Sequence, residues 1–245
     1  DGIAVFVMKS KRLNLILGIL CILALSIVLW VLYLYNLIEH RQYSDADFDI
    51  AYVTSGHDEN ENGIDDTLDL WLGAEKEAQR EPTYQSVYYE GGYPPDTQGV
   101  CTDLIWRAFR DAGYDLKAMI DADIQACPTC YPRIAKPDPN IDFRRVPNIH
   151  VFLERYAQSL TCDLSNIEEW QAGDIVVFGS SHIGILSDVR NQSGVPFLLH
   201  NGGLPKLKED CLAREQFLKG ISGHYRFQYS SEIEKLIQTA ERSLP

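Results

Sequence analysis

Cys101 is the residue of this chain best placed to act as a nucleophile. It follows a loop rich in turn-forming residues, 91–99, and opens a segment whose apolar side chains recur with the period of a helix. These apolar residues are Leu104, Ile105, Ala108 and Phe109. At a helix start, free backbone N–H groups and the helix dipole favour the nucleophilic thiolate over the thiol. The alternative is that Cys101 is a small buried hydrophobic residue.

A cysteine nucleophile needs a base within hydrogen-bond reach, and the base needs an orienting partner. His182 opens the predicted strand 182–189, directly after a Gly-Ser-Ser turn, and His200 closes the predicted strand 195–200. In an antiparallel hairpin the start of one strand lies beside the end of the next. We therefore expect the two imidazoles to meet at one edge of the sheet. Either histidine alone would more often be structural, but two of them with a thiol favour a hydrolytic site.

The order of the predicted elements is typical of an α+β protein. Helices are predicted over 67–80, 101–111, 115–126 and 147–158, and strands over 175–178, 182–189, 195–200 and 223–227. Because the helices come first and an antiparallel β-meander follows, we expect an α+β domain over 67–229 and a tail at 230–245. The apolar residues predicted to share one face of the first helix are Leu68, Trp71 and Leu72, with Ala78 further along it. Gly73 weakens the prediction of that helix.

Residues 15–35 form an apolar segment without a formal charge. A helix needs about 20 such residues to cross the hydrocarbon core of a membrane. Three basic residues between positions 9 and 12 precede the segment, so 1–14 are predicted to be cytoplasmic and the domain extracytoplasmic. The segment is longer than the apolar part of a cleaved signal peptide, which is the alternative. We expect an uncleaved, single-pass anchor in the cell membrane, followed by a stalk at 36–57.

Five cysteines follow the apolar segment, and an odd number outside the cytoplasm suggests one free, reactive thiol. Cys101 is the expected free thiol. Cys127 and Cys130 could close a small disulfide loop, and Cys162 could pair with Cys211. A zinc site on Cys127 and Cys130 is less favoured, because no second Cys-x-x-Cys motif supplies two more ligands.

Residues 58–69 have the spacing of a calcium-binding loop. Oxygen ligands would come from positions 1, 3, 5, 7, 9 and 12, and Gly63 occupies position 6, where such a loop turns sharply. The candidate metal ligands are Asp58, Asn60, Asn62, Ile64 (through its carbonyl), Asp66 and Asp69. The loop resembles those of thrombospondin type 3 repeats and dockerins. The predicted role of calcium is structural, and a solvated acidic loop is the alternative.

Three motifs resemble the NlpC/P60 superfamily of papain-like cysteine hydrolases. They are Val100-Cys101-Thr102-Asp103, Ala172-Gly173-Asp174 with the strand after it, and His182-Ile183-Gly184-Ile185. Segments 140–148 and 199–203 resemble, more narrowly, its DUF1287 branch. The resemblance covers about 67–227 and implies an NlpC/P60-type, papain-like core. It implies that Cys101 attacks an amide carbonyl, His182 is the base and His200 orients it. It also implies peptidoglycan stem peptides as substrates and no cofactor for catalysis.

The candidate substrate-binding residues are Asp103, Tyr89, Asn201 and Arg145. Asp103 departs from the superfamily pattern, in which an acidic residue precedes the cysteine, and it could instead cap the helix. Arg145, like its neighbour Arg144, could pair with substrate carboxylates or be solvated. Tyr89 is one of several tyrosines, at positions 84, 88, 89 and 93, that could donate to an oxyanion. Asn201 lies in the DUF1287-like segment.

Two other functions fit the same motifs: a catalytically inactive cell-wall-binding module of this fold, and an acyltransferase. The formal net charge of −13 argues against a nucleic-acid partner, which requires a basic surface. The expected partners are a peptide or amide substrate, which the resemblance implies, and a membrane, which segment 15–35 would cross. The sequence does not predict the oligomeric state.

Overall fold

The computed structural model describes residues 2–203 and 206–242, with side chains from Leu13 onward. The chain forms two units, Asp1–His40 and Arg41–Pro245. The first unit contains α1 (Gly2–Leu34), whose segment Leu13–Leu34 has a mean hydropathy of 3.1 and is long enough to cross a membrane. This single apolar helix is compatible with an anchor or a signal peptide. The predicted basic flank lies outside the described side chains.

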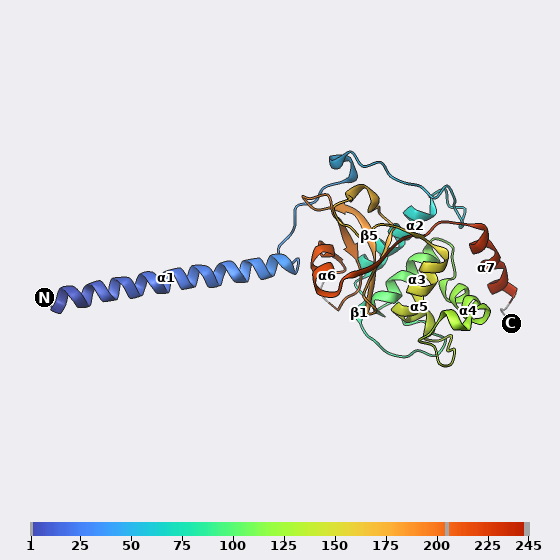
Figure 1. The fold of residues 1–245 in the computed structure, drawn as a ribbon, viewed down its shortest axis with the longest axis horizontal. Coiled ribbons are helices and arrows are strands. Elements are labelled where there is room, and N and C mark those ends of the chain that lie inside the picture. The colour runs from blue at the N-terminus through green and yellow to red at the C-terminus, as the bar shows by residue number, and fades with distance from the viewer. Residues whose placement is uncertain (1, 204–205, 243–245) are drawn as a thin grey trace. The chain divides into compact units, whose positions relative to one another are not determined.

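The second unit is built on a six-stranded antiparallel sheet with the strand order β3-β8-β4-β5-β6-β7 (Figure 1). Its strands are β3 (Gln158–Ser159), β4 (Ile175–Phe178), β5 (His182–Arg190), β6 (Pro196–Leu199), β7 (Lys208–Glu209) and β8 (Ile221–Arg226). A separate parallel pair joins β1 (Thr83–Tyr84) to β2 (Gln98–Gly99). The mixture of helices with an antiparallel sheet confirms the predicted α+β class.

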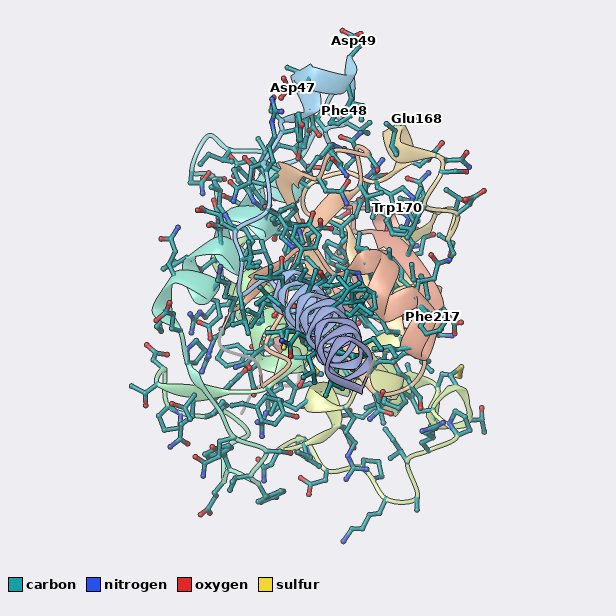
Figure 2. All side chains as sticks on the ribbon, turned by 90° about the vertical axis from the view of Figure 1, so that its left-hand side faces the viewer. Asp47, Phe48, Asp49, Glu168, Trp170 and Phe217 are labelled. Atoms are coloured by element: carbon teal, nitrogen blue, oxygen red, sulfur yellow. A yellow bond between two sulfur atoms is a disulfide. The ribbon has the colours of Figure 1, made fainter. Side chains whose placement is uncertain are left out.

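The central strand β4 is buried on both faces, which explains its uninterrupted apolar sequence. Ile175 and Val177 join the core between the sheet and the main helices. Val176 and Phe178 point the other way, because successive side chains of a strand alternate between faces. They pack in a second, smaller core with Leu212 of α6 (Leu212–Lys219). The outer side of α6 carries Phe217, labelled in Figure 2, which is 89% exposed.

Four helices close to the predicted ones lie on the other side of the sheet. They are α2 (Asp66–Arg80), α3 (Cys101–Asp111), α4 (Leu116–Ala126) and α5 (Val146–Tyr156). Of these, α2, α3 and α5 pack against its strands, and α4 packs against α3, α5 and α7 (Ser231–Arg242). The face predicted for α2 is confirmed in part: Ala78 is buried and Trp71 packs against the core, whereas Leu72 is exposed and the buried Leu70 and Ala74 were not predicted. Gly73 lies where α2 meets α3, and a Cβ there would be 2.9 Å from the Cα of Ala108. The glycine thus permits a close helix contact whose packing offsets its low helix propensity.

Residues predicted as a stalk and a tail belong largely to the second unit. Tyr43 forms a β-bridge with Arg190, and Asp45 at the start of η1 (Asp45–Phe48) forms an ion pair with the same arginine. Figure 2 shows Phe48 at the same end of this unit as Trp170. At the C-terminus, α7 (Ser231–Arg242) buries three apolar residues and packs against α4. The remaining short helices are η2 (Pro128–Cys130), η3 (Asp142–Arg144) and η4 (Ile167–Glu169).

Candidate functional site

His182 and His200 meet at one edge of the sheet, as the antiparallel pairing predicts. Ile185 of β5 pairs with Leu199 of β6. Continuing this register puts His182 and His200 on the same face as diagonal neighbours, which long side chains can bridge. Nε2 of His182 lies 2.6 Å from Nδ1 of His200, and both rings are buried. Only Nδ1 of His182 therefore remains for a further proton transfer.

Cys101 is the first residue of α3, which packs against β5. The backbone N–H groups of Thr102 and Ile183 are directed at its sulfur and act to lower its pKa. Ile183 directly follows His182, so the sulfur faces the start of β5, but among the described residues no hydrogen bond joins it to the ring of His182. The side chain of Cys101 is only 7% exposed.

Burial keeps both reactive groups in their neutral forms. It raises the pKa of Cys101 to about 11, although the two backbone N–H groups act in the opposite direction. Burial and the neighbouring His200 lower the pKa of His182 to about 2. The prediction of a thiolate at the helix start is therefore wrong for this structure, because the cost of desolvating the charge exceeds the stabilisation by the helix start. The resting pair is a thiol and a neutral imidazole.

Glu209 and Cys211 lie behind His200, and the sequence analysis placed neither of them in the candidate site. Nε2 of His200 lies 3.6 Å from the sulfur of Cys211 and 3.9 Å from Oε2 of Glu209. The same carboxylate oxygen accepts a 2.7 Å hydrogen bond from Arg214. Burial would raise the pKa of Glu209, but the contacts with His200 and Arg214 hold it below its usual range. Glu209 belongs to β7, which has only two residues, so hydrophobic periodicity could not predict this strand.

The cysteine pairings were predicted in part. Cys127 and Cys130 form a disulfide, as expected from their spacing. The predicted pair of Cys162 and Cys211 is wrong, because both are free cysteines. Cys211 is buried beside His200, and its N–H···S or S–H···N contact replaces the predicted disulfide. The donor atoms of His200, Glu209 and Cys211 all lie within 4.8 Å of one another, which is compact enough for a metal ion.

Asp103 caps the cysteine helix. Its carboxylate accepts hydrogen bonds from the backbone of Val100, the indole of Trp106 and the guanidinium of Arg144, at 2.7 to 2.9 Å. Asp103 is fully buried, which leaves the capping alternative rather than direct contact with a substrate. Solvation of Arg144 is also wrong, because this buried arginine forms an ion pair with Asp103. Arg145 is exposed, so it remains accessible to a ligand.

Asn201 and Tyr89 hold the loops in front of the cysteine helix. The buried amide of Asn201 donates to the carbonyls of Pro82 and Gly99, at 3.2 and 3.3 Å. The hydroxyl of Tyr89 donates to Gln98, at 2.7 Å. These contacts show how both residues position β1 and β2, and they leave a substrate-binding role for either residue as a prediction.

Tyr84 is the tyrosine that the structure places within electrostatic reach of Cys101. Burial and the proximity of Cys101 raise its pKa above the ordinary value. Its ring would lie 3.4 Å from a Cβ added at Gly203, just beyond the histidine pair. The sequence could not choose among four tyrosines, because the loop that carries them has no periodicity.

The calcium-like loop is closed by its own hydrogen bonds. Asp58 accepts from the backbone of Asn62 and Gly63, and Asp69 accepts from the amides of Asn60 and Asn62. Among the other candidate ligands, Asp66 accepts from the hydroxyl of Tyr114. This carboxylate therefore faces the domain. Calcium binding by the loop stays a prediction.

A cavity of about 510 Å³ lies along the second half of α3. Its walls include the aromatic residues Tyr93, Trp106 and Tyr114, with Arg110 and Lys117 among the charged residues. The described residues that line it include none of the cysteine–histidine cluster. It is therefore a surface separate from the candidate site.

The chain matches the model of one protein family over residues 71–227, described as a domain of unknown function, DUF1287. An uncharacterized protein of Escherichia coli (strain K12), YijF, is 36% identical over 154 residues, which are 60% of this chain and 73% of that protein. No solved structure matches the chain significantly. The matched segment contains Cys101, His182, His200 and Glu209 but excludes α1. The chain belongs to the DUF1287 family.

Proposed function

We propose that the second unit is a cysteine hydrolase that cleaves amide bonds, with Cys101 as nucleophile, His182 as base and His200 as its orienting residue. One observation carries the proposal: the sulfur of Cys101 faces the backbone N–H of Ile183, the residue after His182, and the ring of His182 is hydrogen-bonded to His200. A nucleophile, a base and an orienting group in this order are the parts that acyl transfer requires. The order also fits the resemblance to NlpC/P60 hydrolases.

The neutral pair determines how the reaction would begin. Nδ1 of His182 takes the thiol proton as the sulfur attacks the carbonyl carbon, which becomes a tetrahedral oxyanion. The imidazolium then gives this proton to the leaving amine as the C–N bond breaks, leaving a thioester on Cys101. Water attacks the thioester and loses a proton to His182, and the carboxylic acid and the thiol are released. Because burial disfavours a separate ion pair, proton transfer and attack are coupled.

The oxyanion needs hydrogen-bond donors, and Tyr84 is the side chain proposed for this role. Its hydroxyl stays protonated at neutral pH, because the pKa of Tyr84 is raised. Removing one such donor typically costs about 10²- to 10³-fold in kcat. Tyr88 is a matched control, since its hydroxyl bonds instead with Asp138.

The proposed substrate is the stem peptide of peptidoglycan, and the proposed location is the outer face of the cell membrane. The substrate rests on the resemblance to NlpC/P60 hydrolases, which is a fold-level analogy. The apolar helix α1 would hold the enzyme close to such a substrate. The excess of acidic over basic residues, 35 against 22, gives no basic surface for nucleic acid.

Digestion of purified peptidoglycan by the full chain in detergent, read by mass spectrometry, tests the proposal. We expect new amine and carboxylate ends in the digest with wild-type protein and none with Cys101→Ala. Cys162→Ala is the matched control, because Cys162 is another free cysteine outside the site, and it should retain cleavage. Cleavage by Cys101→Ala would refute the mechanism.

A binding module without catalysis is the second candidate function. The observation that favours it is the buried, protonated state of Cys101. Such a module would sediment together with peptidoglycan and would produce no new amine or carboxylate ends. Wild type and Cys101→Ala would then behave alike. An acyltransferase would give products joined to an added amine, which the same mass spectra distinguish.

A further inference from the structure

We propose that Glu209 is a positioning residue that fixes the tautomers of both imidazoles, so that Nδ1 of His182 carries the lone pair that receives the thiol proton. This inference rests on the proposed hydrolase function. Glu209 is fully buried on β7, and Leu198 of the neighbouring strand is its register partner. It touches neither Cys101 nor a substrate, so it would act only through His200.

The carboxylate of Glu209 is paired with an arginine. Oε2 of Glu209 accepts a 2.7 Å hydrogen bond from Arg214, and a carboxylate in such an ion pair can only accept hydrogen bonds. A buried carboxylate with one cationic partner gains further stabilisation from any N–H dipole that points at it. Its second oxygen, Oε1, has no hydrogen-bond partner among the described residues. The buried charge therefore favours a proton on Nε2 of His200, 3.9 Å from Oε2.

The sulfur of Cys211 competes for the same nitrogen, 3.6 Å away. It could accept from Nε2–H, or its S–H could donate to an unprotonated Nε2. A thiol is a weak donor, whereas the electrostatic preference of a buried carboxylate for a facing N–H is stronger. We therefore assign the proton to Nε2, shared between the carboxylate and the sulfur.

The tautomer of His200 determines the tautomer of His182. A neutral imidazole carries one proton, so His200 with Nε2–H has a lone pair on Nδ1. That lone pair lies 2.6 Å from Nε2 of His182, which must then be the donor. His182 is neutral, because burial lowers its pKa, so its Nδ1 is unprotonated and can accept a proton. The opposite tautomer of His200 would leave His182 with Nδ1–H, which cannot act as a base.

The same three side chains could instead bind a metal ion, and the two uses exclude each other. A metal on His200 needs the lone pair of Nε2. The proton of His200 would then sit on Nδ1 and would be donated to His182. Arg214, 2.7 Å from the carboxylate of Glu209, favours the metal-free arrangement, because it already neutralises that charge.

The direct test is the tautomer of His182, measured by long-range ¹H–¹⁵N correlation on the full chain in detergent with ¹⁵N-labelled histidine. His182→Gln and His200→Gln assign the two rings. We expect wild-type His182 to be protonated at Nε2 and unprotonated at Nδ1, and His200 to be protonated at Nε2. A proton on Nδ1 of His182 would overturn the proposal, and so would stoichiometric metal in the purified protein together with an unprotonated, metal-bound Nε2 of His200.

Glu209→Gln supplies the second arm. Its neutral amide can donate or accept, so we expect a mixture of tautomers at both rings and a roughly 10- to 100-fold lower kcat with KM nearly unchanged, in the range of lost acid–base catalysis. Glu215→Gln is the matched control: Glu215 is another buried glutamate that contacts Arg214, and its replacement should leave the tautomers unchanged. Unchanged tautomers in folded Glu209→Gln would contradict the proposal.

The proposed hydrolase function and the positioning role of Glu209 can be tested separately. In His200→Asn, the amide oxygen can still accept from His182, but the link to Glu209 is cut. Glu209→Gln should then have no additional effect on kcat, as a double-mutant cycle measures. If the chain cleaves no amide at all, the proposed function fails, while the wild-type NMR measurement still decides the role of Glu209.

Discussion

Two buried histidine sites lie on the same sheet, and their difference separates a candidate catalytic imidazole from a structural one. His224 on β8 uses both ring nitrogens: Nδ1 bonds the carbonyl of Thr161, and Nε2 bonds the carboxylate of Asp174, at 2.7 and 3.1 Å. Its ring also stacks on Trp170. His182 uses one nitrogen for His200 and retains the other. A buried histidine with both nitrogens bound has no position left for proton transfer.

The carboxylates differ as well. Asp174 contacts His224 directly and also forms two 2.7 Å hydrogen bonds with Arg226. In the other cluster, Glu209 reaches His182 only through His200. Burial and the neighbouring His200 lower the pKa of His182, so its ring stays neutral and able to accept a proton. The two clusters therefore differ in whether a carboxylate oxygen lies directly against the imidazole.

The largest expected effect is on catalysis. His182→Gln should lower the rate of amide cleavage by roughly 10³-fold, because no side chain is left to take the thiol proton. His224→Gln should change the rate per folded molecule less than about tenfold, since His224 lies outside the reacting groups. Equal losses in both variants, measured at the same folded fraction by product release, would remove the distinction between the two sites.

The next effect is on stability. Asp174→Asn leaves Arg226 buried without its charge partner, and breaking such a pair costs about 3–5 kcal/mol. Asp188→Asn on the neighbouring strand is the control, because Asp188 is exposed and should change stability by less than about 0.5 kcal/mol. Urea unfolding of both variants measures the difference. A loss below about 1 kcal/mol for Asp174→Asn would contradict the structural role of this cluster.

Alkylation measures the protonation state of Cys101 in the candidate site. Because the pKa of Cys101 is raised from 9.0 to about 11, its thiolate fraction at pH 7 should be about 100-fold lower than that of an ordinary thiol. Iodoacetamide labelling of the full chain, with Cys101→Ser to assign the site, should rise steadily to beyond pH 10. Fast labelling at pH 7 would instead indicate the thiolate that the sequence suggested.

The last expected effect is on the pH dependence of unfolding. The pKa of His182 is lowered from 6.5 to about 2, so below pH 6.5 the unfolded chain binds a proton that the folded chain does not. Stability should therefore rise with pH between about 2 and 6.5, by up to about 1.4 kcal/mol per unit from this residue. His182→Gln should lose this part of the slope between pH 4 and 6. An identical slope would show that His182 is charged in the folded state.

The sequence predicted most of the elements that form this site, because their patterns are long and regular. The apolar stripe of α3 and the β-branched residues of β4 reflect burial against a sheet, which periodicity reports well. The meeting of His182 with His200 followed from antiparallel pairing alone. The buried face of α2 was predicted only in part, because the close approach of α2 to α3 at Gly73 has no local pattern in the sequence.

What the sequence missed depends on contacts between distant residues. Arg144 was expected in solvent, yet it lies 41 positions after its partner Asp103 and is buried with it. Counting cysteines assigned Cys211 to a disulfide, whereas the turn after β7 places it beside His200. The thiolate prediction considered the helix start and not the depth at which Cys101 is buried. Long-range pairing and desolvation have no local pattern in the chain.

The central claim is that Cys101 forms a covalent bond with its substrate, and acid-quenched mass spectrometry during turnover tests it most directly. With peptidoglycan stem peptides, wild-type protein should carry an added mass equal to the acyl part of the substrate. Peptide mapping should place this mass on Cys101, and Cys101→Ala should show neither adduct nor cleavage. Cleavage without an adduct in wild type that persists in Cys101→Ala would contradict the account.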